Sequence, residues 1–209
     1  MPLDKHTEAE LIRRLLAGDQ QAYRQAVASY QPSMLRLARA MLDWGSAEEV
    51  VQDTWVAVLR GLSGFEARAS LKTWLLTIVR HTALSRLRRS GRELLIGDGW
   101  DDDVLAQPAD RFDNRGHWQA PPQPWHEETP EALLAGEQLR GVLQQALEQL
   151  PPPQRSAVTL RDVEGLDMDA LCAVLGVTQA NARVLLHRGR SRLREAVASY
   201  QNGVAAEVP

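Results

Sequence analysis

The chain has 209 residues, of which 44% are hydrophobic and 24% are charged. It is long enough for one large domain or two small ones, and it carries enough apolar residues to bury a core. The formal net charge of -3 argues against a uniformly basic coat for nucleic acid. Local basic patches can still bind DNA, because salt screening confines charge effects to roughly 8–10 Å.

The cysteine content and the N-terminus argue against a disulfide-bonded, a secreted or a membrane-spanning protein. The single cysteine, Cys172, excludes an internal disulfide and a multi-cysteine zinc site, and its apolar neighbours predict a buried core thiol. The N-terminus has no apolar signal core, and no run approaches the roughly 18 apolar residues of a membrane span. We therefore expect a cytoplasmic protein without direct membrane insertion.

Residues 7–89 form a first block that is predicted to be helical. The expected helices cover residues 7–17, 20–31, 34–42, 47–59 and 71–89, with N-caps at Thr7, Asp19, Ser46 and Ser70. Pro32 is expected to end the second helix, and Gly61–Ala69 to form a loop. No segment alternates with the period of a strand, so the block is predicted to be all-α.

Residues 92–131 differ sharply in composition and are predicted to form an extended acidic linker. Aspartate, glutamate and proline dominate the stretch, which cannot bury enough apolar surface to fold alone. It also carries the large aromatic residues Trp100, Phe112, Trp118 and Trp125, which an inert spacer would not need. Two interpretations stay open for them: docking on a partner, or docking on one of the helical blocks.

Residues 132–200 form a second predicted block, followed by a loose tail over residues 201–209. The expected helices cover residues 132–150, 154–163, 168–175 and 179–200, the last two capped by Asp167 and Thr178. The predicted fold class is therefore all-α, with two small helical domains, residues 1–91 and 132–200, joined by the acidic linker.

The last two helices meet at a tight turn that is typical of a helix-turn-helix. Gly176 permits the sharp reversal, and Thr178 can cap the next helix by accepting from its free N–H groups. Ala182, Leu186 and Gly189 recur at helical spacing beyond the turn, so this stripe is expected to pack inward. The second helix is then the one that would enter a DNA major groove.

The outward face of that second helix is rich in arginine and polar residues. Those expected to contact DNA, at base edges or phosphates, are Thr178, Gln179, Asn181, Arg183, Val184, His187, Arg188, Arg190 and Arg192. Val184 and Leu185 lie off the inward stripe, so at least one is expected to be exposed or to meet a partner. A helical pair that does not bind DNA is the alternative interpretation.

A second basic cluster lies towards the end of the first block. Its members are Lys72, Arg80, His81, Arg86, Arg88 and Arg89, with the aromatic residues Phe65 and Trp74 beside them. Basic side chains neutralise phosphates, and exposed aromatics stack on unpaired bases at about 1–3 kcal/mol each, so the cluster suits melted DNA. The alternative makes Trp74 a core residue and the arginines a solvated helix end; taken alone, the residues favour it.

The helix over residues 47–59 carries an acidic and polar face. Glu48 and Glu49 lie near its start, where carboxylates suit the helix dipole. The dipole explains Gln52, Asp53 and Trp55 less well, and these residues would also suit a docking face for a basic partner. From the residues alone, neither interpretation prevails.

Three segments together, Ser46–Arg60, Ser70–Arg89 and Leu150–Arg194, resemble one protein family. The first is similar to the helix with which sigma factors dock on the clamp coiled coil of the largest polymerase subunit. The second is similar to the segment that captures the promoter -10 element, and the third to the helix-turn-helix that reads the -35 element. The chain thus resembles the sigma-70 family of bacterial RNA polymerase sigma factors, in its extracytoplasmic-function (ECF) branch.

The resemblance implies a role for each surface and a set of partners. The acidic face would contact core RNA polymerase, the basic cluster would capture and help melt the -10 element, and the loop over residues 65–72 would hold a flipped base. The expected partners are core polymerase, duplex and melted promoter DNA, and an anti-sigma factor. No catalysis, metal or cofactor is expected. The chain departs from common family residues at His81, Ser85, Val184 and Leu185, so its DNA contacts are expected to differ in detail.

Two functions outside this family stay open from the sequence. One is a helix-turn-helix regulator that binds duplex DNA without polymerase, and the other is an inhibitor or adaptor that uses the same faces for protein contacts. An enzyme would have His81, Asp110 and His117 as candidate residues. It would lack a phosphate-binding glycine loop, a metal-ligand cluster and a nucleophile–base pair of recognised spacing.

Overall fold

The computed structural model describes residues 5–89 and 130–206 of the chain. Within those ranges every regular element is a helix, which confirms the predicted all-α class. The first block consists of α1 (Lys5–Leu16), α2 (Gln20–Met41), α3 (Trp44–Gly61), the short 3-10 turn η1 (Leu62–Gly64) and α4 (Leu71–Arg89). The second consists of α6 (Pro130–Glu148), α7 (Pro152–Val158), the π-helical turn η2 (Thr159–Val163), α8 (Met168–Leu175) and α9 (Gln179–Ala206).

The helix starts follow local hydrogen bonding, and two predicted caps are wrong. Asp19 caps α2 by accepting from the backbone N–H of Gln21 and Ala22, as predicted. However, α1 begins at Lys5, so Thr7 lies inside it. Asp43, not Ser46, caps α3, because its extended backbone lets the carboxylate accept from the N–H of Ser46.

Pro32 does not end a helix, contrary to the sequence-based expectation. The two helices predicted on either side of it are one continuous helix, α2. A proline inside a helix removes one hydrogen bond and crowds the preceding turn, which costs about 3 kcal/mol. Tyr30, Met34 and Leu37 flank it and are buried, so packing on both sides offsets that cost.

The second block follows its predicted course with two changes at the C-terminal side. The helix expected over residues 154–163 is α7 followed by a π-helical turn. The last helix, α9, extends to Ala206, so residues 201–206 of the expected loose tail are helical. Cys172 is half-buried against the core, short of the full burial predicted for it.

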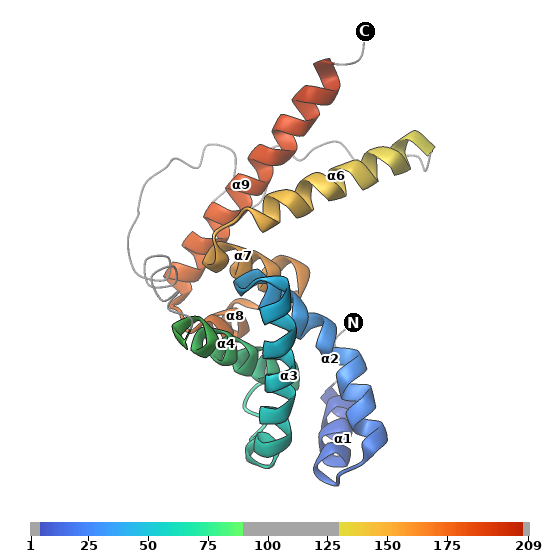
Figure 1. The fold of residues 1–209 in the computed structure, drawn as a ribbon, viewed down its shortest axis with the longest axis vertical. Helices are drawn as coiled ribbons and strands as arrows, with labels where there is room; N and C mark the ends of the chain where they lie inside the picture. Colours follow the sequence, from blue (N-terminus) through green and yellow to red (C-terminus); the bar gives the residue numbers. More distant parts are fainter. Residues whose placement is uncertain (1–4, 90–129, 207–209) are drawn as a thin grey trace.

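The two blocks pack against each other in this structure. Helix α4 contacts α8, and α2 contacts α7 and the π-helical turn, while α6 and α9 extend away from the first block (Figure 1). The buried apolar residues of both blocks form one continuous cluster, which reaches from Leu11 in α1 to Leu186 in α9. The predicted linker aromatics, and the candidate residues Asp110 and His117, lie outside the described residues.

Candidate nucleic-acid interface

The turn between α8 and α9 has the geometry that the sequence predicted. Gly176 takes a left-handed backbone conformation (φ 61°) that favours glycine, and its N–H donates to the carbonyl of Cys172. Thr178 then caps α9 by accepting from the N–H of Asn181 at 3.2 Å. The pair is therefore a helix-turn-helix whose second helix starts at Gln179.

One side of α9 is buried, and it is wider than predicted. Ala182 and Leu186 are 0% and 3% exposed, and a Cβ at Gly189 would lie 2.7 Å from the side chain of Val158, so the inward stripe is confirmed. Leu185 is also buried, because α9 packs on α6, α7 and α8 together. Val184 is only half-buried, so neither residue is the fully exposed apolar side chain that the sequence allowed.

The opposite side of α9 presents polar side chains in a row. Gln179, Arg183 and His187 are exposed and four residues apart, so they lie one turn above another on the same face. The carboxylate of Asp169 in α8 accepts from the side-chain amide of Gln179 at 2.8 Å. The oxygen of that amide accepts from Arg183 at 3.3 Å, so the amide orientation is set by both neighbours.

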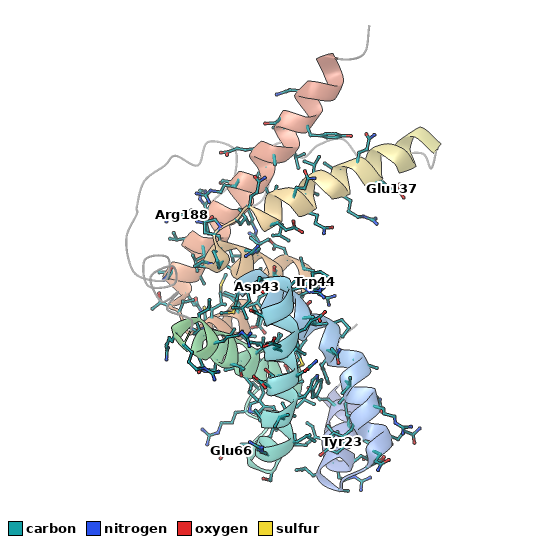
Figure 2. The ribbon with its side chains drawn as sticks, viewed as in Figure 1. Tyr23, Asp43, Trp44, Glu66, Glu137 and Arg188 are labelled. Atoms are coloured by element: carbon teal, nitrogen blue, oxygen red, sulfur yellow. The ribbon has the colours of Figure 1, made fainter. Side chains whose placement is uncertain are left out.

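The arginines further along α9 differ in their surroundings. Arg190 makes a two-pronged ion pair with Asp162 in the π-helical turn, at 2.6 and 3.0 Å. The hydrogen bond that Arg190 donates to Asp162 raises the pKa of Arg190, whereas burial lowers the pKa of Arg194. Arg188, labelled in Figure 2, is half-buried. Arg192 is exposed. The structure therefore gives Arg190 a partner inside the protein.

The exposed face of α3 contains most of the predicted partner-binding residues. Glu48, Glu49, Gln52 and Asp53 are exposed, while Trp55 is half-buried against the core with its indole N–H buried and without a hydrogen-bond partner. The two glutamates also form ion pairs inside the first block. Glu48 lies 3.7 Å from Arg39, and Glu49 lies 2.5 Å from Arg86.

Three exposed apolar residues on α3 were missed from the sequence. Val56 and Leu59 are 45% and 57% exposed, and Trp44 is 64% exposed at the start of the helix (Figure 2). Val56 follows Gln52 by four residues, so helical spacing could have placed it on the same face. The guanidinium carbon of Arg39 lies 3.3 Å from the centre of the Trp44 ring.

The residues of the predicted -10 cluster differ in how far their side chains are exposed. His81, Arg88 and Arg89 are exposed at the C-terminal half of α4. The rings of Phe65 and Trp74 pack on each other, with centroids 5.1 Å apart and planes tilted by 53°. Both rings are half-buried against the core, which agrees in part with the interpretation of Trp74 as a core residue.

The remaining basic residues of α4 face other parts of the protein. Arg86 is paired with Glu49, as described above, and Lys72 is paired with Glu164 of the second block. The guanidinium of Arg80 lies against the helix-turn-helix turn, between 3.1 and 3.4 Å from the position of a Cβ on Gly176. Burial lowers the pKa of Arg80, and the nearby charge of Arg88 lowers it further.

Glu164, which follows the π-helical turn, contacts three residues of the first block. Its side chain is 2% exposed and accepts from Ser33 at 2.6 Å, from Lys72 at 2.7 Å and from Arg36. Burial raises the pKa of Glu164, but the hydrogen bonds from these three residues outweigh it and hold the pKa below its usual value. No local sequence signal predicts this contact, because its partners are 92 to 131 residues away.

The described residues contain neither a metal-ligand cluster nor a single membrane-spanning helix. No group of three or more His, Cys, Asp or Glu side chains within residues 5–89 and 130–206 is arranged to hold a metal ion. In the same ranges no single helix has the length and apolar composition of a membrane span. The helices Met168–Leu175 and Gln179–Tyr200 reach that composition only as a pair, across a bend of 96°.

Comparison with known proteins assigns both blocks. The Sigma-70 region 2 family matches residues 26–93, and the Sigma-70 region 4 family matches residues 140–193. The ECF RNA polymerase sigma-E factor of Escherichia coli strain K12 is 28% identical over 187 residues, which is 90% of this chain and 92% of that protein. The RNA polymerase sigma-H factor of Pseudomonas aeruginosa is 28% identical over 196 residues, which is 93% of this chain and 96% of that protein.

Two solved structures share the fold. The sigma factor RpoE in complex with the anti-sigma factor NepR from Bartonella quintana has a TM-score of 0.56 at 24% identity, covering 84% of this chain and 96% of that one. CnrH in complex with the cytosolic domain of CnrY has a TM-score of 0.55 at 19% identity, covering 92% of this chain and 97% of that one. With both sigma regions present in this order, the chain belongs to the sigma-70 family of RNA polymerase sigma factors, in its ECF branch, and it binds core RNA polymerase and directs promoter recognition.

Proposed function

We propose that three surfaces divide the work of promoter recognition: α3 docks on core polymerase, α4 and the loop before it capture the -10 element, and α9 reads the -35 element. The observation that carries the proposal is the face of α9 on which Gln179, Arg183 and His187 are exposed one turn apart, opposite a buried side. A helix presented in this way fits the B-DNA major groove, which is about 12 Å wide.

Within α9 the roles follow from exposure and from internal partners. Gln179 and Arg183 would contact base edges, with Thr178, Asn181, Val184 and His187 beside them. Arg188 and Arg192 would contact phosphates on the flanks. Arg190 is also among the predicted contacts, and its ion pair with Asp162 ties α9 to the π-helical turn. We assign it to positioning of the recognition helix.

The docking surface on α3 combines charge with apolar area. Gln52 and Asp53 have exposed side chains, and Val56 and Leu59 extend the same helix surface. An apolar patch with a polar, acidic rim suits a basic protein partner, which is the composition expected of a specific interface. Glu48 and Glu49 are exposed within this surface, and the half-buried Trp55 lies beside it.

Capture of the -10 element would use α4 and the loop over residues 65–70. His81, Arg88 and Arg89 are exposed for phosphate contacts, and the exposed loop beside the Phe65–Trp74 ring pair would receive a flipped base. Lys72, Arg80 and Arg86 belong to the same surface and are half-buried, each against another group of the protein. The same surface of α4 and the loop would also help to melt the -10 region.

A charge reversal tests the docking surface. Asp53→Arg places a like charge opposite a basic partner, and we expect it to weaken binding to purified core polymerase by at least about tenfold, the equivalent of about 1.4 kcal/mol. Glu137→Arg is the matched control, because Glu137 is exposed on α6, remote from α3 (Figure 2). Equal affinities for the two variants, both shown to be folded by circular dichroism, would refute the docking assignment.

Runoff transcription over a genomic library, with purified core polymerase and this chain, tests the whole proposal. Promoter-dependent RNA is expected only when both are present. A protein that binds duplex DNA but yields no such RNA would instead be a regulator acting without polymerase. We propose further that the chain acts in the cytoplasm without catalytic activity of its own, because the phosphodiester chemistry belongs to polymerase.

An anti-sigma factor is the remaining proposed partner. The two structures that share the fold were determined as complexes with the anti-sigma factor NepR and with the cytosolic domain of CnrY. Co-purification of the tagged chain from its own cells, followed by mass spectrometry, tests this proposal. A partner that releases the chain from core polymerase on addition would support it, and recovery of polymerase subunits alone would count against it.

A further inference from the structure

Three hydrogen-bond donors of the first block converge on one anion. The hydroxyl of Ser33, the guanidinium of Arg36 and the ammonium of Lys72 all contact the carboxylate of Glu164. Lys72 also donates to the backbone carbonyl of Glu164 at 3.0 Å. The donors come from two helices, α2 and α4, whereas the acceptor is the only member of the set from the second block.

The donor set has an excess of positive charge over its present occupant. Two cations and a hydroxyl surround a single carboxylate whose side chain is 2% exposed. Guanidinium and ammonium groups with a nearby hydroxyl are also the donors that proteins use for phosphate. If the second block moves away, the first block keeps all three donors and loses the anion. What remains is a preformed site for another anion.

One member of this site, Lys72, lies on the DNA-capture helix α4, which carries a second covered residue. Lys72 and Arg80 are eight residues apart on α4, about 12 Å along the helix axis. The first is covered by Glu164, and the second by the turn at Gly176. The second block therefore occupies a continuous strip of α4 that includes two of the basic residues assigned to the -10 element.

We propose that Ser33, Arg36 and Lys72 form a binding site for a backbone phosphate of single-stranded promoter DNA, and that Glu164 occupies this site while the two blocks are packed together. Glu164 thus competes with DNA for the same donors. The proposal adds Ser33 and Arg36 to the DNA-contacting residues, and it rests on the assignment of α4 to -10 capture.

The test uses the full chain and a fluorescein-labelled dT20 oligonucleotide, with affinity measured by fluorescence anisotropy at several salt concentrations. Glu164→Gln removes the competing charge, and we expect about tenfold tighter binding than for the native chain. Glu137→Gln makes the same charge change on α6 and is expected to leave the affinity unchanged. Small-angle scattering should show a larger radius of gyration for Glu164→Gln than for Glu137→Gln.

A second set of variants removes the proposed phosphate ligands. Arg36→Gln in the Glu164→Gln background should abolish the gain and reduce the slope of log affinity against log salt by about one. Arg24→Gln is its control, since Arg24 is an exposed arginine on the same helix. If Glu164→Gln fails to fold, Arg36→Gln and Arg24→Gln in the native background decide the matter, because only the former should weaken dT20 binding.

Two results would overturn the proposal. One is equal dT20 affinity for Glu164→Gln and Glu137→Gln, and the other is a gain that survives Arg36→Gln. Core polymerase binding, measured in parallel on the native chain, separates this failure from failure of the proposed function. If the chain binds polymerase but neither effect is seen, the proposed function stands and the proposed phosphate site is refuted.

Discussion

Gly189 lies where α9 crosses α7, and substituting it gives a sharp test of how the second block is packed. A Cβ at this position would lie 2.7 Å from a methyl carbon of Val158 and 3.4 Å from the carbonyl oxygen of Gln154. Carbon atoms in contact prefer about 3.5–4.0 Å, so roughly 1 Å must be gained by moving α7, α9 or a buried valine with stiff rotamers. Gly189→Ala is therefore expected to destabilise the block.

The magnitude follows from two opposing contributions. Overpacking of this kind costs about 1–3 kcal/mol, while replacing a helical glycine by alanine gains about 1 kcal/mol. Gly141→Ala on α6 isolates the second contribution, because nothing lies within 4 Å of a Cβ there. We expect Gly141→Ala to be stabilising, and Gly189→Ala to lie about 1–3 kcal/mol below it in free energy of unfolding.

The assay is urea unfolding followed by circular dichroism, on both variants and the native chain. A lower midpoint for Gly189→Ala with an unchanged slope against urea would report a true loss of stability. Adding Val158→Ala removes the clashing methyl group, so the two substitutions should be less destabilising together than the sum of their separate effects. If Gly189→Ala were as stable as Gly141→Ala, the close crossing of α7 and α9 would be refuted.

Three other expectations concern DNA, acid and the thiol. Arg183→Ala should weaken binding of the holoenzyme to a selected -35 duplex by about 1–3 kcal/mol, and an equal loss on all sequences would make it a phosphate contact instead. Because Arg36, Lys72 and Ser33 lower the pKa of Glu164, its contribution to stability is present at neutral pH and is lost as the pH falls below about 4.3, the pKa of a free glutamate. The free energy of unfolding in urea should therefore fall between pH 7 and pH 3 for the native chain, and it should fall less for Glu164→Gln. Burial, and secondarily Asp169, raises the pKa of Cys172, so it should react with a disulfide reagent more slowly than glutathione at pH 7; an equal rate would contradict this.

The helix-turn-helix could be predicted from sequence because its signals are local. A glycine in the left-handed region and a threonine cap act within one turn of the residues they order, so they operate wherever the chain is placed. The inward stripe of α9 could also be predicted, since helical spacing alone puts Ala182 and Leu186 on one face. Leu185 was not, because its burial depends on three neighbouring helices rather than one.

Several basic residues show the limit of reading a site from composition. Lys72, Arg80 and Arg190 all have the charge that DNA binding requires, yet each lies against a group from a distant part of the chain. Sequence gives the charge of such a residue but not its partner. Exposure separates Lys72 and Arg80 from His81, Arg88 and Arg89, which the sequence treated as equivalent members of the same cluster.

The sequence by itself determined the helical class, the two blocks and the recognition turn, because spacing, caps and turn residues act over a few residues. Only the tertiary structure decided that α2 continues through Pro32 and that Glu164 lies among Ser33, Arg36 and Lys72. Both outcomes depend on packing between segments far apart in the chain. At Pro32, burial of the flanking residues outweighs the local tendency of proline to break the helix. At Glu164, packing of the two blocks brings together charged residues that are separated by about half the chain.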